Sequence, residues 1–116
     1  MAPSRSTHCT VVNNTPLTLT LSGSKCHHGQ WTLNFGPPDT IAANGKATFQ
    51  AESAGVMTGD EGYASYSSSA GTFTFRFNNP FSGSNDYDES GPGSCKIKRD
   101  GGGGDDARVT WTIEIS

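Results

Sequence analysis

Apolar and polar side chains alternate with a period of two residues along much of this 116-residue chain. Successive side chains of an extended strand point to opposite faces, so this alternation predicts strands with one buried and one solvated face. The apolar sets that share a predicted face are Leu17, Leu19 and Leu21; Trp31, Leu33 and Phe35; Ala47, Phe49 and Ala51; Phe73, Phe75 and Phe77; and Val109, Trp111, Ile113 and Ile115. No stretch has the i, i+3, i+4, i+7 spacing of an amphipathic helix.

Turn-forming residues separate these apolar sets. Asn13–Pro16 is expected to form a tight hairpin turn, because Asn tolerates left-handed dihedrals and Pro fixes its own. Further turns are predicted at Asn44-Gly45, Thr58–Gly62, Ser68–Gly71 and Asn78–Pro80, with a glycine-rich connector at 101–104. Short strands spaced about 8–12 residues apart predict an all-β, antiparallel sandwich of two sheets. Residues 1–116 are expected to form one domain, with residues 1–6 as a loosely structured arm.

The chain carries few charges. Asp, Glu, Lys and Arg make up 16% of it, against about a quarter in ordinary globular proteins. Its net charge of −3 gives no footprint for nucleic acid, and it repels copies of the protein only weakly. The first ten residues contain no apolar stretch of a signal peptide, so synthesis in the cytoplasm is expected. An intracellular inclusion or crystal body, or release without a signal peptide, would follow.

Five motifs occur in an order that resembles a known family. They are Val12-Asn13-Asn14, Gly29-Gln30-Trp31, Ala51–Gly62 (AESAGVMTGDEG), Phe77–Tyr87 (FNNPFSGSNDY) and Val109–Ile113. The chain resembles the aegerolysin-type proteins, most closely the small component of the binary insecticidal crystal toxins of Bacillus. The resemblance implies a two-sheet β-sandwich without enzymatic activity. Some relatives recognise membrane lipids and make pores with a larger partner protein, and the crystal toxins accumulate as intracellular crystals.

Three cysteines, Cys9, Cys26 and Cys95, stand outside the shared motifs. An odd number leaves at least one without a partner in its own chain. The predicted hairpin places Cys9 opposite Thr20, on the polar face. Cys26 then lies up to about 20 Å away, beyond the roughly 7 Å that a disulfide allows between Cα atoms. We therefore expect all three to be candidates for intermolecular disulfides, with free thiols as the alternative.

Two groups of potential metal ligands occur. His8-Cys9 and Cys26-His27-His28 offer zinc-binding atoms, but neighbouring strand residues point to opposite faces, so His8 and Cys9 cannot easily reach one ion. Asp86, Asp88 and Glu89 lack the glycine and terminal glutamate of a calcium-binding EF-hand loop. They are interpreted as a solvated acidic loop. We predict neither a metal site nor a cofactor.

Catalysis is not expected. Glu52, Asp60 and Glu61 are interpreted as strand-end and turn residues rather than as a facing pair of catalytic carboxylates, and no Gly-x-Ser-x-Gly elbow is present. Trp31 and Trp111 belong to alternating apolar sets, which indicates burial. Phe81 and Tyr87, in the predicted loop after Asn79-Pro80, are the predicted contact surface.

Two functions follow from these observations. The first is a non-enzymatic structural protein that self-associates into dense crystal- or inclusion-like bodies held by intermolecular disulfides. The low charge and the cysteines favour it. The alternative is the membrane-lipid-binding component of a two-part pore-forming toxin, with a larger protein as its partner. This alternative rests on the family resemblance.

Overall fold

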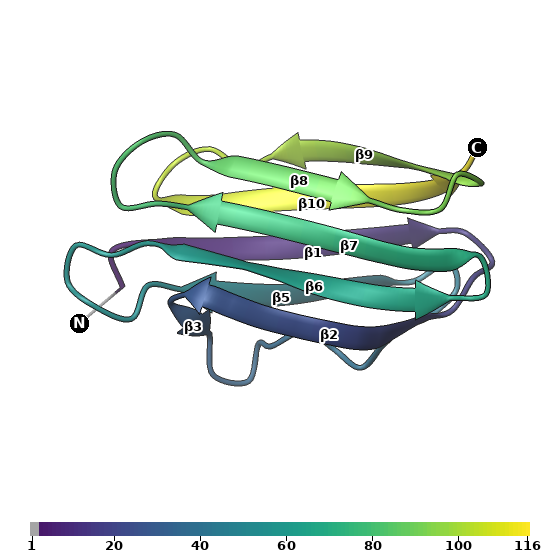
Figure 1. Ribbon diagram of the computed structural model, residues 1–116, viewed down its shortest axis with the longest axis horizontal. Helices are drawn as coiled ribbons and strands as arrows, with labels where there is room; N and C mark the ends of the chain where they lie inside the picture. Colours follow the sequence, from purple (N-terminus) through teal and green to yellow (C-terminus); the bar gives the residue numbers. More distant parts are fainter. Residues whose placement is uncertain (1–2) are drawn as a thin grey trace.

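The protein is a sandwich of two five-stranded sheets in a computed structural model that describes residues 3–116 (Figure 1). One sheet has the strand order β3-β5-β1-β10-β9 and the other β4-β2-β6-β7-β8. The strands are β1 (Ser6–Asn14), β2 (Leu19–His28), β3 (Gln30–Trp31), β4 (Thr40–Ile41), β5 (Lys46–Glu52), β6 (Asp60–Ser68), β7 (Gly71–Asn79), β8 (Asp86–Ser90), β9 (Cys95–Gly101) and β10 (Asp106–Ile115). The all-β, two-sheet prediction is confirmed, and residues 3–116 contain no helix that could cross a membrane.

The core lies between the inner faces of the two sheets. Phe73, Phe75 and Phe77 of β7 are buried there with Trp111 of β10, and the Phe75 and Trp111 ring centroids are 5.3 Å apart. Trp111 is fully buried, as its alternating pattern predicted. Trp31 is half-buried and packs against the core from the short edge strand β3. The period-two pattern therefore identified most of the inner face correctly.

Strand β1 is central to its sheet, and one of its pairings is not antiparallel. It runs parallel to β10 and antiparallel to β5. The predicted hairpin between the first two strands is wrong, because β1 and β2 lie in different sheets. The Asn13 amide donates to the carbonyl oxygens of Leu17 (2.8 Å) and Ala42 (3.0 Å). The Asn13–Leu17 turn therefore carries the chain from one sheet to the other.

The predicted strand through Trp31, Leu33 and Phe35 ends at Trp31. A tight turn follows, in which the Phe35 amide donates to the Thr32 carbonyl at 2.8 Å. Leu33 is consequently 83% exposed and Phe35 52% exposed. Alternation over so few residues is compatible both with a strand that buries these side chains and with a turn that exposes them.

The sandwich begins earlier than the predicted loose arm allows. Strand β1 starts at Ser6, and Arg5 exchanges two hydrogen bonds with Ser53: Arg5 N to Ser53 Oγ at 3.1 Å and Ser53 N to Arg5 O at 2.9 Å. Residues 1 and 2 of the predicted arm lie outside the described residues.

Candidate functional site

One end of the sandwich carries two neighbouring loops, which we call the loop end. They are residues 53–59, between β5 and β6, and residues 80–85, between β7 and β8. Both loops project at the left of Figure 1, at the end where β1 begins, whereas the C-terminus lies at the opposite end. The loop end is therefore formed by two connections that strands β6 and β7 separate in the sequence.

Loop 53–59 presents two large apolar side chains to solvent. Val56 is 81% and Met57 67% exposed. Thr58 closes the turn beneath them, since its Oγ1 accepts from the Gly55 amide at 3.0 Å and donates to the Gly55 carbonyl at 2.7 Å. Met57 has a φ of 58°, which is costly for a side chain other than Gly, Asn or Asp. The turn thus keeps both apolar side chains in solvent, although their exposure to water and the positive φ of Met57 are both unfavourable.

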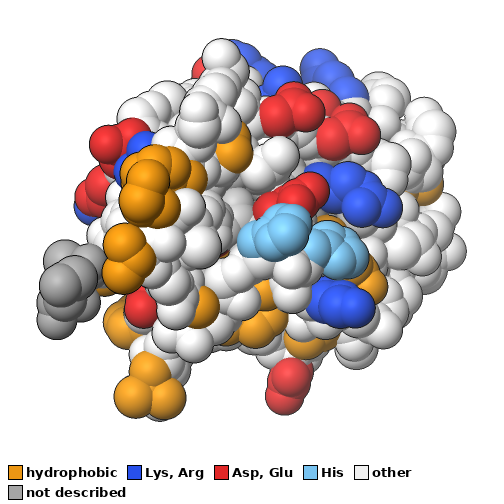
Figure 2. Space-filling view, turned by 60° about the vertical axis from the view of Figure 1, so that its left-hand side comes forward, with side chains coloured by type: hydrophobic (Ala, Val, Ile, Leu, Met, Phe, Trp, Pro, Cys, Tyr) orange, Lys and Arg blue, Asp and Glu red, His pale blue; other side chains and the backbone are white. Residues whose placement is uncertain are grey.

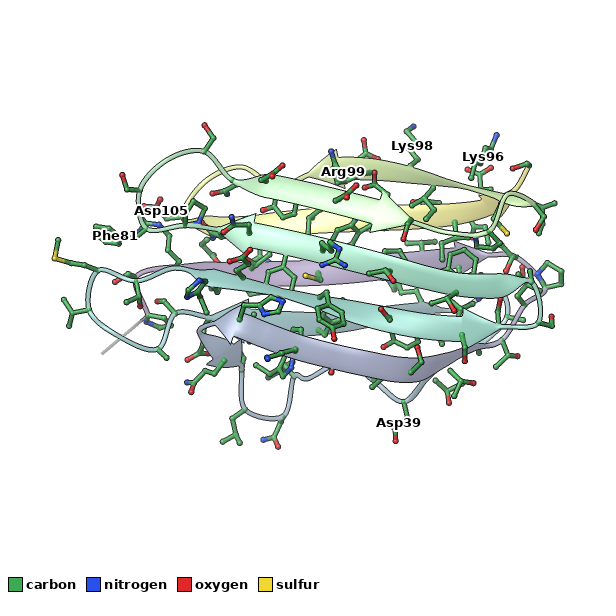
Figure 3. The ribbon with its side chains drawn as sticks, in the orientation of Figure 1. Asp39, Phe81, Lys96, Lys98, Arg99 and Asp105 are labelled. Atoms are coloured by element: carbon green, nitrogen blue, oxygen red, sulfur yellow. The ribbon has the colours of Figure 1, made fainter. Side chains whose placement is uncertain are left out.

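Loop 80–85 is held by Arg5. The guanidinium donates to the carbonyl oxygens of Phe81 (2.6 Å) and Pro80 (3.3 Å) and lies 4.7 Å from the centroid of the Phe81 ring. It also forms an ion pair with Asp105 at 3.4 Å. Figure 3 shows Phe81 and Asp105 side by side at this end. Phe81 is therefore a half-buried, positioned side chain rather than a free one.

Tyr87, the other residue of the predicted contact surface, does not join Phe81. It lies within β8, half-buried, where its hydroxyl donates to the Gly102 carbonyl at 2.7 Å. A Cβ at position 102 would collide with the Tyr87 ring, so this packing requires glycine there. The structure gives Tyr87 a packing role and leaves Phe81 at the loop end.

Asp60 lies at the root of the loop end. It is the first residue of β6, not part of a turn as expected, and only 1% exposed. Its Oδ1 accepts a 2.6 Å hydrogen bond from the Thr7 hydroxyl. Burial raises the pKa of Asp60 to about 6; the bond from Thr7 opposes this, and the charge of Glu52 adds to it. Asp60 also lines a hollow of about 290 Å³ beside Phe81.

Apolar side chains gather on this part of the surface. Figure 2, which brings the loop end forward, shows them along one edge of the molecule, with histidines and charged side chains on the neighbouring face. Among residues 3–116, two of the exposed large apolar side chains belong to the loop end, Val56 at 81% and Met57 at 67%. Val56 and Met57 were not among the predicted contact residues. The available signal was two adjacent apolar residues within a glycine-flanked turn.

The cysteine prediction is wrong for Cys9. Because β1 pairs with β5 and β10, Cys9 faces the core beside Phe49 and Val109 and is 1% exposed. Burial, and secondarily the charge of Asp60, raises the pKa of the Cys9 thiol well above its ordinary value. Cys26 and Cys95 are half-buried, and all three thiols are free. Cys9 cannot reach a neighbouring molecule without local unfolding.

The other candidate ligands are dispersed or occupied. His8 points away from Cys9 and contacts Asp106 Oδ1 at 2.8 Å, so these neighbours serve opposite faces as expected. Asp86, Asp88 and Glu89 lie in strand β8 rather than in a loop. Glu89 accepts from Arg99 at 2.6 Å and from the Trp111 indole at 3.0 Å. Within residues 3–116, no group of three His, Cys, Asp or Glu side chains has the arrangement of a metal site.

Comparison with known proteins identifies the fold. No protein-family model matches the chain, and no curated protein matches it in sequence. Among solved structures, it superimposes on the crystal structure of the lipid binding protein Nakanori with a TM-score of 0.86, over 96% of this chain and 71% of that one. The chain has the same fold as Nakanori. The two sequences are 14% identical, so the likeness to Nakanori concerns the fold alone, and it gives no support to the Bacillus toxin link.

Proposed function

We propose that this protein binds lipid membranes through its loop end, as an aegerolysin-like, non-enzymatic protein. The observation that carries the proposal is the Val56–Met57 turn, which holds two large apolar side chains outward at 81% and 67% exposure. Exposing such side chains to water is unfavourable, whereas moving them into the apolar boundary of a bilayer is favourable. The lipid-binding description of Nakanori, which has the same fold, supports the same reading.

The surroundings of the turn suit an interfacial position. Arg5 lies over the Phe81 ring at the loop end, so a cationic side chain, the kind that anionic headgroups attract, stands beside an apolar ring. The molecule measures 42 × 25 × 19 Å, and the loop end occupies one extremity of its long direction (Figure 1). A contact made there leaves most of both sheets exposed to water. A larger pore-forming partner remains part of the proposal.

Vesicle sedimentation tests the proposal directly. The panel is phosphatidylcholine alone, then with phosphatidylserine, sphingomyelin or cholesterol added in turn. Fully burying an apolar side chain contributes about 1.5–3 kcal/mol, and the turn inserts only in part. We therefore expect the double variant Val56→Ser/Met57→Ser to bind roughly 10- to 100-fold more weakly.

Ile115→Ser is the matched control, because Ile115 is 50% exposed and belongs to the last strand, whose end lies opposite the loop end. It should bind like the unaltered protein. Leu33→Ser tests whether the β3–β4 turn also touches the membrane. Absence of binding to every vesicle would refute the proposal, as would undiminished binding by a correctly folded double variant.

Self-assembly through disulfides has less support. Because Cys9 is buried, it cannot serve as one of the three predicted sites of intermolecular disulfides, although the half-buried Cys26 and Cys95 remain candidates. Comparing reducing with non-reducing gels distinguishes the two functions, because lipid binding requires no disulfide. Particles that dissolve only in reductant would favour self-assembly.

A further inference from the structure

Two buried oxygen atoms at the root of the loop end have no hydrogen-bond partner among residues 3–116: Asp60 Oδ2 and Asn79 Oδ1. Both residues are at least 99% buried. Buried polar atoms nearly always have a partner, so each exception needs a physical explanation. Two such atoms on neighbouring residues suggest a shared explanation.

Asp60 and Asn79 are directly opposite one another. Asp60 begins β6, Asn79 ends β7, and the two form a register pair on the inner face. The Cβ atoms of such cross-strand pairs are about 4.5–5.5 Å apart. The Asn79 amide donates to the carbonyl oxygens of Ser6 (3.0 Å) and Asp105 (2.9 Å). Its nitrogen is therefore fully used, and its oxygen is the atom left to meet Asp60.

The backbone beside this pair leaves little space for rearrangement. A Cβ at Gly59 would collide with the Asn79 carbonyl and with Pro80. On the other side, the Thr7 hydroxyl occupies Asp60 Oδ1. Two acceptor oxygens in such a confined position cannot bond to each other, but a single proton between them satisfies both.

We infer that Asp60 carries a proton on Oδ2 and donates it to Asn79 Oδ1, forming a latch that a rise in pH releases. Loss of the proton places a carboxylate against an amide oxygen in a buried position, which is unfavourable. Because Asn79 also holds Ser6 and Asp105, the latch joins β6 and β7 to the starts of β1 and β10. Loops 53–59 and 80–85 are anchored at these residues.

The pKa of Asp60, raised by burial to about 6, places this transition between the pH values of 5 and 7.5 that are compared below. Burial raises the pKa of Cys26 to about 11 and that of Tyr87 to about 12, so neither titrates in the same range. The charged or titratable groups around Asp60 are Glu52 on β5, Cys9 on β1, Cys26 and His28 on β2, Glu61 on β6, Tyr87 on β8, and Arg5 and Asp105 at the loop end.

If the loop end binds lipid as proposed above, the latch regulates that binding. With the latch formed, the two loops are already ordered before they bind. With the latch released, the free energy needed to order the loops is subtracted from the free energy of binding. Apparent affinity falls in proportion to the competent fraction of the protein. Vesicle binding should therefore be stronger at pH 5 than at pH 7.5.

Asp60→Asn is the decisive variant, because its amide can accept from Thr7 and donate to Asn79 at every pH. Asp39→Asn is the control, since Asp39 is exposed and distant from the loop end (Figure 3). The first readouts use no lipid: the infrared band of a protonated carboxyl, and hydrogen exchange of loops 53–59 and 80–85 at pH 5 and 7.5, corrected for intrinsic rates.

The unaltered protein and Asp39→Asn should show the protonated band at pH 5 and lose loop protection several-fold by pH 7.5. Asp60→Asn should lack that band and keep the protection. Urea unfolding gives a further check with a defined sign. Between the ordinary value of 3.8 and about 6, the folded protein keeps a proton that the unfolded chain releases. The unfolding free energy should therefore fall as pH rises through this range, except in Asp60→Asn.

Vesicle sedimentation then tests the regulation separately. We expect the unaltered protein to bind roughly five-fold more weakly at pH 7.5 than at pH 5, and Asp60→Asn to bind equally at both. An Asp60 that is ionised at pH 5 would overturn the latch, and so would equal pH dependence of loop protection in Asp60→Asn. Normal latch readouts without binding to any vesicle would refute the proposed function and leave the latch standing.

Discussion

At the scale of single residues, Met57 combines two unfavourable features. Its φ of 58° lies in the left-handed region, which costs an ordinary L-residue about 1–2 kcal/mol. Its side chain is also 67% exposed, so no packing within the protein compensates for that cost. Strained residues of this kind cluster at functional sites, where the strain serves a purpose other than stability. If the loop end binds lipid as proposed, the requirements of binding and of folding conflict at Met57.

Met57→Gly should raise stability and weaken binding together. Glycine adopts a positive φ without strain, but it loses more backbone entropy on folding, so we expect a net gain of about 0.5–1 kcal/mol in the unfolding free energy. Urea unfolding measures that gain, and vesicle sedimentation measures the loss of binding. Val56→Gly is the matched control, because Val56 is not among the residues of positive φ. It should lose binding without gaining stability, and equal stabilisation of both variants would refute the strain argument.

At the scale of elements, the buried face of a strand could be predicted from the sequence more reliably than the strands beside it. Period-two alternation correctly assigned the inner sides of β5, β7 and β10, because that pattern reports burial directly. It could not show that β1 pairs with β10, since pairing between distant strands leaves no local signal. The error at Cys9 followed from this one, because a different neighbouring strand placed it in the core. The Phe81 loop was recognised, but its anchoring by a residue 76 positions earlier was not.

Arg5 is expected to act as a clamp for loop 80–85. Arg5→Ala removes the bonds to the carbonyl oxygens of Pro80 and Phe81 and the ring contact. The loss should be about 1–2 kcal/mol in unfolding free energy, with faster hydrogen exchange in residues 81–85.

Arg5→Lys is the informative comparison for that clamp. It keeps the charge opposite Asp105 but loses the planar set of donors, so it should restore only part of the protection. Complete rescue by lysine would show that the ion pair, rather than the carbonyl contacts, holds the loop.

At the scale of the whole molecule, the thiol expected to react first and the loop end lie at opposite ends. Cys95 begins β9 and pairs with Ile115, so it lies opposite the loop end (Figure 1). Cys9 is buried, whereas Cys26 and Cys95 are both half-buried, and burial raises the pKa of Cys26 to about 11. The thiolate is the reactive form of cysteine. Cys95 is therefore the thiol that a neighbouring molecule would reach first.

Mild oxidation should produce a dimer linked through Cys95 rather than an extended lattice. A non-reducing gel should show a dimer that Cys95→Ser abolishes and Cys26→Ser retains. Thiol labelling should follow the order Cys95, Cys26, Cys9, with Cys9 reacting only on unfolding. Such a dimer leaves both loop ends free, so it should sediment with vesicles at least as well as the monomer. Rapid labelling of Cys9 in the folded protein would contradict the burial on which this order depends.

The parallel pairing of β1 with β10 has a consequence for synthesis. Ser6 and Asp106 are neighbours in the sheet although 100 residues separate them. During translation, β1 emerges well before β10, so one of its two neighbouring strands is missing until about 100 further residues have been made. Contacts between such distant segments slow folding, because a long loop must close before they form. The centre of the first sheet is thus completed late, and until then β1 offers an open edge that other nascent chains or chaperones can bind.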